Sequence, residues 1–153
     1  IHRALQLGLP GDVLVVDGGG VVERALIGEI MKRVAQARGF AGIIIDGAIR
    51  DAQAFADDEF PCYARGITHR GPYKDGPGEI NVPVSIGGAV VHPGDIAAGD
   101  RDGIVFIPPA DAREVAAATR KKGSDEVATM ASIADGTYDD AWVQEFLAGK
   151  GVR

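Results

Sequence analysis

The stretch GIIIDGAIRD, residues 42–51, places a guanidinium and a carboxylate immediately after a run of apolar residues. Three consecutive isoleucines predict a buried strand, and Asp46-Gly47 is expected to break it. In open α/β sheets, ligands bind just beyond the carboxyl ends of the strands. Arg50 can therefore hold an anionic group, and Asp51 can hold a hard metal ion. The alternative is a turn capped by Asp51, with Arg50 in a surface ion pair.

The residues before this stretch predict a second strand and a helix. Residues 13–16 are four consecutive apolar residues, which is typical of a strand buried on both faces. A helix is expected to begin between residues 23 and 28 and to end near Arg38. Its core-facing stripe would consist of Ile27, Ile30, Met31 and Val34. Strand, helix and strand within about 35 residues predict a βαβ unit with a parallel pair of strands.

The same unit brings Glu29 into the argument. Because the carboxyl ends of parallel strands share one edge, Glu29 in the first turn of the helix and the Arg50-Asp51 pair are expected to face one crevice. The backbone amides of Ile30 and Met31 would point there, with the positive end of the helix dipole behind them. The alternatives are an i,i+4 ion pair between Glu29 and Arg33, and core positions for the side chains of Ile30 and Met31.

The second half of the chain indicates antiparallel structure. Apolar runs at 80–86, 89–91, 96–98 and 103–107 alternate with Gly-Gly, Pro-Gly-Asp and Asp-Gly turn signals. The segment 66–80 is rich in glycine and proline and is expected to be a long irregular loop. Its polar residues His69, Arg70, Tyr73 and Lys74 could face a substrate, or the loop could be an exposed connector or a subunit contact.

Helices are expected at both ends of the chain. Residues 2–7 predict a short helix, and the carboxyl end predicts three: near 110–122, at 125–134 with Ser124 as a cap, and at 139–148. The last helix carries Trp142 and Phe146 on a face with no obvious partner, which favours contact with another subunit. A short helix after Arg50 and a strand at 61–65 complete the pattern.

Composition narrows the class of protein. The chain has 153 residues, 25% of them charged and a net charge of −6, which fits one sizeable domain and argues against a nucleic-acid surface. No segment approaches the roughly 20 apolar residues of a membrane span. The lone Cys62 is expected to be a small core residue in a cytoplasmic protein. Gly18-Gly19-Gly20 lack nucleotide-binding spacing. The chain begins without methionine, apparently inside a helix, so an amino-terminal portion is expected to be absent.

Four segments together resemble one known family. They are VLVVDGGG at 13–20, ALIGE at 25–29, AGIIIDGAIRD at 41–51 and PGDI at 93–96. These segments are similar to the RraA-like family, which includes class II 4-hydroxy-4-methyl-2-oxoglutarate/4-carboxy-4-hydroxy-2-oxoadipate aldolases. The likeness covers residues 1–110. It implies an α/β fold, a swivelling α/β/β sandwich with a parallel βαβ unit, an antiparallel half and C-terminal helices. Residues 111–153 would be a helical extension for subunit contact.

The resemblance also implies a set of site residues. Asp51 would hold Mg²⁺ or Mn²⁺, Arg50 the pyruvyl oxygen, and the backbone at Gly28, Ile30 and Met31 the pyruvyl carboxylate. Glu29 would orient a water molecule. Glu126 is the candidate for a glutamate that reaches in from a neighbouring subunit of a homotrimer or homohexamer, with Asp125 beside it as the competing choice.

Two departures from the family pattern bear on function. The best-characterised family aldolases have aspartate where this chain has Glu29, which affects the general-acid role. The family's inhibitor of ribonuclease E lacks the aspartate that is present here as Asp51. The resemblance therefore implies a metal-dependent aldolase that cleaves a 4-hydroxy-2-oxo acid to pyruvate and a second 2-oxo acid, with oxaloacetate decarboxylase activity. The alternative is a non-catalytic regulator.

Overall fold

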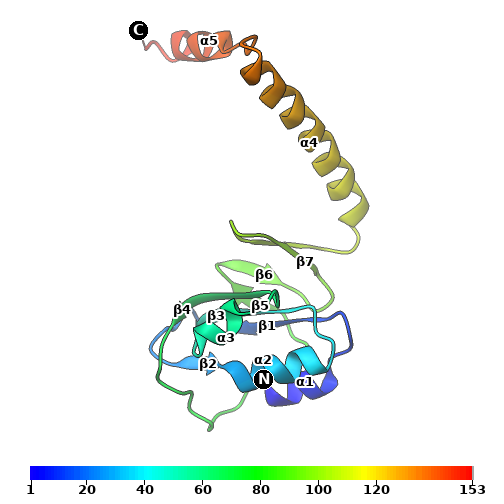
Figure 1. Cartoon of the computed structure of the whole chain (residues 1–153), viewed down its shortest axis with the longest axis vertical. Helices are drawn as coiled ribbons and strands as arrows, with labels where there is room; N and C mark the ends of the chain where they lie inside the picture. Colours follow the sequence, from blue (N-terminus) through cyan, green and yellow to red (C-terminus); the bar gives the residue numbers. More distant parts are fainter. Residues whose placement is uncertain (153) are drawn as a thin grey trace. The chain divides into compact units, whose positions relative to one another are not determined.

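The computed structural model describes residues 1–152 and divides into two compact units, Ile1–Pro109 and Ala110–Arg153. The first unit contains three helices and eight strands, and the second contains the helices α4 and α5 (Figure 1). The candidate site residues Glu29, Arg50 and Asp51 all belong to the first unit.

The strand β3 (Gly42–Ile49) is the centre of the first unit. All eight of its residues are buried, and it pairs in parallel with β1 (Val13–Asp17), β2 (Ala25–Ile27) and β4 (Cys62–Ile67). The predicted parallel pairing of the first strand with this one is confirmed. The expectation that Asp46-Gly47 ends the strand is wrong: β3 continues through these residues, and only its register with β4 shifts there.

The short strand β2 was not predicted, and the helix expected from residues 23–28 begins only at Glu29. Because β4 occupies one edge of β3, β1 and β2 follow each other along the opposite edge. The glycines after β1 make this possible: the amides of Gly18 and Gly20 donate to the carbonyl oxygen of Asp46 at 3.1 and 3.0 Å. A Cβ on Gly18 would lie 2.7 Å from that oxygen, so only glycine allows this close approach.

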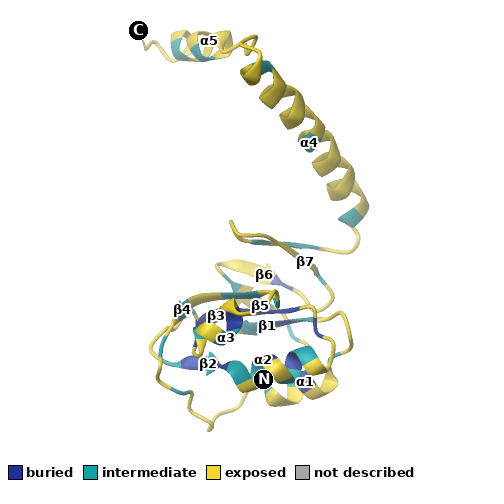
Figure 2. Ribbon diagram, viewed as in Figure 1, coloured by how far each residue is buried: buried dark blue, intermediate teal, exposed yellow. Residues whose placement is uncertain are grey.

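Helices cover one face of the parallel sheet. They are α1 (His2–Leu7), α2 (Glu29–Ala37) and α3 (Ala52–Ala56), and Figure 1 shows α1 and α2 beneath the strands. The core between helices and sheet consists of buried apolar residues: Leu5, Leu14, Ile27, Ala35, Phe40, Ile43, Ile45, Ile49 and Phe55. Ile43, Ile45 and Ile49 of β3 belong to this core, and the residues between them face the opposite side of the sheet, so the unbroken burial of the strand (Figure 2) requires cover on both faces.

An antiparallel hairpin covers the other face. It consists of β5 (Val84–Ile86) and β6 (Ala89–Val91), and carboxylates of the sheet hold it in place. Asp17 accepts a hydrogen bond from the Ser85 amide, and Asp46 accepts one from the Gly87 amide, each at 3.0 Å. The Arg65 side chain also pairs with Asp46 and lowers the pKa of that carboxyl, with help from the Gly87 amide.

A second hairpin completes the first unit and confirms the predicted fold class. The strands β7 (Ile96–Gly99) and β8 (Ile104–Ile107) are antiparallel and turn at Asp102-Gly103 as expected. Helices, parallel sheet and antiparallel hairpins form the predicted α/β/β arrangement. The strand expected at 80–86 is shorter, so residues 68–83 form one irregular segment.

The predicted core-facing stripe of α2 is wrong in two places. The side chain of Ile30 points into solvent, and the residue is 75% exposed. Lys32 is buried instead, with 2% of its surface exposed. Ile27 is buried as expected, although it belongs to β2 and not to the helix. Met31 and Val34 are half-buried and pack against the core.

The second unit consists of two helices. The helix α4 (Ala112–Ala134) is continuous, so the two helices predicted for this stretch are one. Ser124 is not a cap: its hydroxyl donates to the Arg120 carbonyl inside the helix at 3.1 Å. The helix α5 (Ala141–Gly149) exposes Trp142 and Phe146 to about 60%. Contact of these residues with another subunit stays a prediction.

Candidate active site

The structure brings Glu29 beside Arg50-Asp51, as predicted, through strands that differ from those expected. Ile27 at the end of β2 pairs with Ile49 at the end of β3, and the Arg50 amide donates to the Ile27 carbonyl at 3.0 Å. The helix α2 begins two residues after Ile27. Its first turn therefore lies at the carboxyl end of β3, the position at which open α/β sheets bind ligands.

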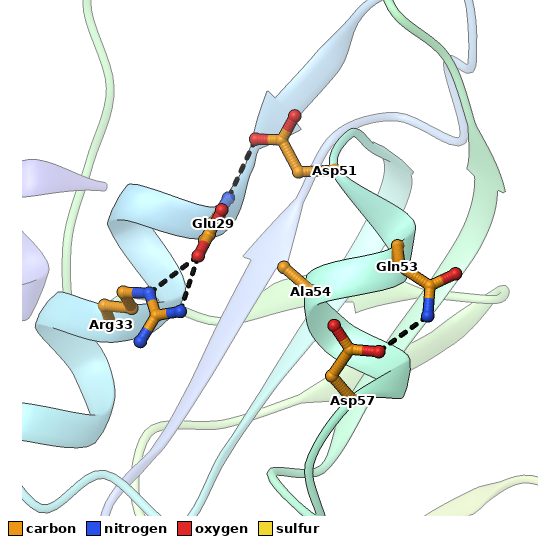
Figure 3. Close-up of a pocket in the computed structure, with 6 residues that line it drawn as sticks. All are labelled: Glu29, Arg33, Asp51, Gln53, Ala54 and Asp57. Atoms are coloured by element: carbon orange, nitrogen blue, oxygen red, sulfur yellow. Dashed lines mark hydrogen bonds and ion pairs between the residues drawn. The ribbon is translucent and has the colours of Figure 1, made fainter.

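Asp51 is the residue that joins the two elements. Its backbone is left-handed, with φ of 55° and ψ of 40°, and its side chain makes no hydrogen bond to α3. One carboxylate oxygen accepts a hydrogen bond of 3.0 Å from the Glu29 amide and lies 3.6 Å from Nε of Arg50 (Figure 3 shows the first contact). The Asp51 side chain therefore does not cap α3, but the surface ion pair of Arg50 that the alternative predicted is present, with Asp51 as its partner. Few non-glycine residues adopt this φ, and those that do are often found at functional sites.

Gly28 provides the space for this contact. A Cβ at this position would lie 2.4 Å from Oδ2 of Asp51 and 3.0 Å from Nε of Arg50. The backbone of Gly28 is extended, with φ of −149°, so any residue could adopt it. Glycine is required here because two side chains approach the backbone closely.

Glu29 has two kinds of neighbour. Its carboxylate accepts a hydrogen bond from Nε of Arg33 at 2.7 Å. This is the i,i+4 ion pair that was expected as the alternative to a place for Glu29 in the site. Glu29 also lines a pocket together with Asp51 (Figure 3). The ion pair and a place in the site therefore coexist, and Arg33 orients the glutamate at the pocket.

The first turn of α2 offers backbone donors beside this pair. Within residues 1–152, the amides of Ile30 and Met31 have no hydrogen-bond acceptor, as is usual for the first turn of a helix. The positive end of the helix dipole lies at the same place. The exposed side chain of Ile30 leaves these amides near solvent, so an anion can reach them.

The pocket has a volume of about 280 Å³ and lies between α2 and α3. Six residues line it: Glu29, Arg33, Asp51, Gln53, Ala54 and Asp57. Sequence reasoning missed Gln53 and Asp57 as lining residues, although they follow Asp51 in the predicted helix. Nε2 of Gln53 donates to Asp57 at 2.6 Å (Figure 3).

Lys32 fixes the two walls of this pocket relative to each other. Its ammonium donates to the Ala54 carbonyl and forms an ion pair of 2.6 Å with Asp58. The lysine lowers the pKa of Asp58 to about 2, and the amide of Phe60 and the side chain of Gln36 act in the same direction. Because Lys32 belongs to α2 and its partners lie in or just after α3, the contact holds Asp51 at the start of α2.

The donor set fits a hard divalent cation that keeps much of its water. Among the described residues, no group of three or more His, Cys, Asp or Glu side chains could enclose a metal. Mg²⁺ is often bound by only one or two carboxylates together with oxygens of water and substrate. Asp51 offers such a carboxylate, since it is partly exposed and one of its oxygens has no hydrogen-bond donor within residues 1–152.

Glu126 belongs to the second unit, whereas all the residues that line the pocket belong to the first. Glu126 lies in α4 of the second unit, where its carboxylate is 3.5 Å from Lys122. Asp125 beside it pairs with Lys121 at 2.7 Å. A role for either residue in the site of a neighbouring subunit stays a prediction.

Comparison with known proteins decides the family. The model of the RraA-like family, described as Aldolase/RraA, matches residues 1–106. The chain belongs to the RraA-like family. The match covers the whole sheet and every residue that surrounds the pocket, and it ends near the boundary of the first unit.

Individual relatives of this RraA-like chain have two kinds of name. A protein of Halalkalibacterium halodurans named "Putative 4-hydroxy-4-methyl-2-oxoglutarate aldolase" is 40% identical over 135 residues, which cover 88% of this chain and 64% of the relative. The solved structure of Streptomyces coelicolor RraAS2, described as an unusual member of the RNase ES inhibitor RraA family, is 33% identical with a TM-score of 0.76. That alignment covers 84% of this chain and 67% of the other.

A third relative is the RNA-processing inhibitor RraA from Thermus thermophilis. It is 35% identical with a TM-score of 0.65, over 69% of this chain and 65% of that protein. The chain thus spans about two thirds of the length of these relatives.

Within residues 1–152, the structure contains no helix that is both long and apolar enough for a bilayer.

Proposed function

We propose that this RraA-like chain is a metal-dependent aldolase that cleaves a 4-hydroxy-2-oxo dicarboxylic or tricarboxylic acid to pyruvate and a second 2-oxo acid. Oxaloacetate decarboxylation would accompany this activity, because both reactions pass through the enolate of pyruvate. The observation that carries the proposal is the Asp51 carboxylate beside Arg50, at the amino end of α2. The aldolase name of the Halalkalibacterium halodurans relative supports the same reaction class.

Substrate binding follows from the charges around α2. The 2-oxo acid has a carboxylate that the amides of Ile30 and Met31 can bind, with the helix dipole in support. Gly28 leaves the approach open because it has no side chain. The guanidinium of Arg50 can donate to the 2-keto oxygen of the substrate. These contacts would fix the substrate by its pyruvyl end.

Asp51 is the residue that would hold Mg²⁺ or Mn²⁺. When bound, the metal would act as a Lewis acid toward the 2-keto group. The partial exposure of Asp51 and its unpaired oxygen suit a cation with several water ligands. The hydrogen bond from the Glu29 amide keeps the Asp51 carboxylate at one position.

The bond changes balance without a covalent enzyme intermediate. A base removes the proton of the 4-hydroxyl group, the C4–O bond becomes a carbonyl, and the electrons of the C3–C4 bond move to C3 and the 2-keto oxygen. Arg50 stabilises the negative charge that grows on this oxygen. A water molecule oriented by Glu29 then gives a proton to C3 and completes pyruvate. The hydrogen bond from Arg33 holds the Glu29 carboxylate at the pocket.

A second candidate function is inhibition of another enzyme by protein contact. Two structural relatives carry names of RNA-processing inhibitors, which favours this alternative. The position of Asp51 favours catalysis, since a contact surface has no need of a left-handed aspartate that is hydrogen-bonded to a helix amino end.

The assembly belongs to the proposal as well. A homotrimer or a pair of trimers would bury the exposed apolar residues of α4 and α5, and would allow Glu126 to reach a neighbouring site. Light scattering on the purified chain measures the mass directly. A monomer at micromolar concentration would contradict this part of the proposal.

The deciding experiment measures pyruvate released from oxaloacetate, with Mg²⁺ and with EDTA, for the wild type, Asp51→Ala and Asp102→Ala. Asp102 is a matched control, because it is an exposed aspartate in the turn between β7 and β8. We expect Mg²⁺-dependent release by the wild type and by the control, and a loss of at least about 100-fold in Asp51→Ala. Equal metal-dependent turnover by Asp51→Ala would overturn the assignment.

A further inference from the structure

The loop that follows β4 passes directly over the end of the sheet that carries the site. The Thr68 amide donates to the Ile49 carbonyl at 2.9 Å, so the loop begins beside the residue that precedes Arg50. Two residues later, the Arg70 carbonyl accepts a hydrogen bond of 2.9 Å from the Ala25 amide at the start of β2. The loop is therefore fastened to both strands whose ends form the site.

Arg24 makes the next two contacts with the same loop. Its Nη1 donates to the Gly71 carbonyl at 2.9 Å, and its guanidinium carbon lies 3.9 Å from the centre of the Tyr73 ring. A guanidinium above an aromatic ring at this distance is a cation–π contact. We call Arg24, Gly71 and Tyr73 the Arg24 clamp. Arg24 is only partly exposed, whereas Tyr73 is 74% exposed.

The clamp places Gly71 next to the guanidinium of Arg50, with no side chain between the two. A Cβ built on Gly71 would lie 3.3 Å from Nη1 of Arg50, and no other atom would come within 4 Å. Arg50 thus lies between two neighbours, with Asp51 3.6 Å from its Nε and Gly71 beside its Nη1. The guanidinium has no other salt bridge within residues 1–152, and its side chain is 44% exposed.

We propose that the Arg24 clamp is a positioning device for Arg50. By holding Gly71 near Nη1, it limits how far the Arg50 guanidinium can turn toward the loop, and so presents the guanidinium to the substrate oxygen. Arg24 and Tyr73 are positioning residues, because their contacts are with the loop. The expected effect of the clamp on turnover rests on the proposed function. The expected effect of the clamp on the orientation of Arg50 does not depend on that function.

The physical reason is the entropy of a long side chain. An arginine that is 44% exposed and held by one contact at 3.6 Å samples several rotamers, and each substrate encounter must select among them. The loop backbone nearby on the second side limits rotation in that direction and removes part of this freedom before binding. Loss of this limit therefore weakens binding of the pyruvyl group, whereas the chemistry of a correctly bound substrate changes less.

The test compares Tyr73→Ser, which removes the ring, with Tyr73→Phe, which keeps it. Lys74→Ser is the control, since Lys74 is an exposed residue of the same loop outside the clamp. The first measurement is the ¹⁵N–¹H resonance of Arg50 Nε, assigned through Arg50→Lys. The second is KM and kcat for oxaloacetate with Mg²⁺. Thermal unfolding of each variant shows whether the fold is retained.

We expect the Arg50 resonance to move and broaden in Tyr73→Ser and to stay at the wild-type position in Tyr73→Phe and Lys74→Ser. KM should rise about three- to tenfold in Tyr73→Ser, with kcat within about twofold of the wild type. An unmoved Arg50 resonance in Tyr73→Ser overturns the inference, whatever happens to KM. If the wild type does not turn over oxaloacetate, the proposed function fails, and the resonance alone decides on the clamp.

Gly71→Ala provides an independent test from the opposite direction. The added methyl group would meet Nη1 of Arg50 and nothing else, so it changes the loop beside Arg50 without removing the clamp. We expect the Arg50 resonance to move while the stability of the fold stays within the error of the wild type. A resonance that does not move in this variant would show that Gly71 does not lie next to Arg50 in solution, and would also overturn the inference.

Discussion

The backbone amide of Glu29 donates a hydrogen bond of 3.0 Å to the carboxylate of Asp51, although the two residues are 22 positions apart. This bond ties the first turn of α2 to the residue that follows β3. It also means that Asp51 has two separable properties, the acceptor oxygen that holds the helix and the negative charge that would hold a metal.

Asp51→Asn separates these properties, because asparagine keeps an acceptor oxygen and loses the charge. We expect Mn²⁺ affinity, measured by calorimetry, to fall at least tenfold, while urea unfolding changes by less than about 0.5 kcal/mol. Asp51→Ala should lose the metal and about 1 kcal/mol of stability as well. Wild-type Mn²⁺ affinity in Asp51→Asn would contradict a metal role for this carboxylate.

Gly28→Ala tests the close approach of Asp51 and Arg50 to the backbone. The new Cβ would lie 2.4 Å from Oδ2 of Asp51, so the carboxylate and the guanidinium must move. We expect at least a tenfold loss of pyruvate release and a stability loss of about 1–3 kcal/mol. The matched control is Gly78→Ala, whose Cβ would meet nothing within 4 Å. Equal activity of the two variants would show that the approach is unimportant.

The position of the site could be predicted from the sequence, but the strand that creates it could not. The isoleucine run and the charged pair after it are enough to place Arg50-Asp51 at a strand end. Strand β2 has only three residues, which is too short for an alternating pattern to appear, and it follows three glycines that resemble a loop. The prediction that Glu29 lies nearby was right because a helix must begin near a strand end, whichever strand that is.

Residues whose partners lie on another element were the ones that the sequence concealed. Lys32 was not among the residues expected in the core, yet its ammonium is buried between the Ala54 carbonyl and Asp58. Helical periodicity assigned Ile30 to the core, although it lies at the helix end beside the pocket and is exposed. Both errors come from one cause: a short helix next to a site exchanges apolar burial for a specific polar contact.

Lys32 and Asp58 should give unequal effects when they are removed one at a time. Lys32→Met keeps the volume of the buried stem and leaves the partly exposed Asp58 to water, so we expect a loss of about 1–2 kcal/mol. Asp58→Ala leaves the ammonium of Lys32, a residue that is only 2% exposed, without its counter-ion. This change should destabilise the fold more than Lys32→Met does. Urea unfolding of both variants measures the difference. A smaller effect for Asp58→Ala would contradict burial of the lysine.

Acid stability should reveal the same ion pair. Lys32, the Phe60 amide and Gln36 stabilise the Asp58 carboxylate and lower its pKa to about 2 in the folded chain. In the unfolded chain, the pKa of an aspartate is about 3.9. The contribution of Asp58 is therefore complete above about pH 4 and is lost as pH falls toward 2. Unfolding curves between pH 2 and 6 should fall more steeply for the wild type than for Asp58→Asn. Parallel curves would contradict the lowered pKa.

Cys62 should be unreactive in the folded chain. Burial raises the pKa of its thiol to about 11, although the charge of Lys32 opposes this shift. Because the thiolate is the reactive form, alkylation by iodoacetamide at pH 8 should be on the order of 100-fold slower than for a free cysteine, and should become fast in urea. Mass spectrometry of the alkylated chain gives both rates. Native labelling at the free-thiol rate would show that Cys62 is an accessible nucleophile, and would reopen its exclusion from the chemistry of the site.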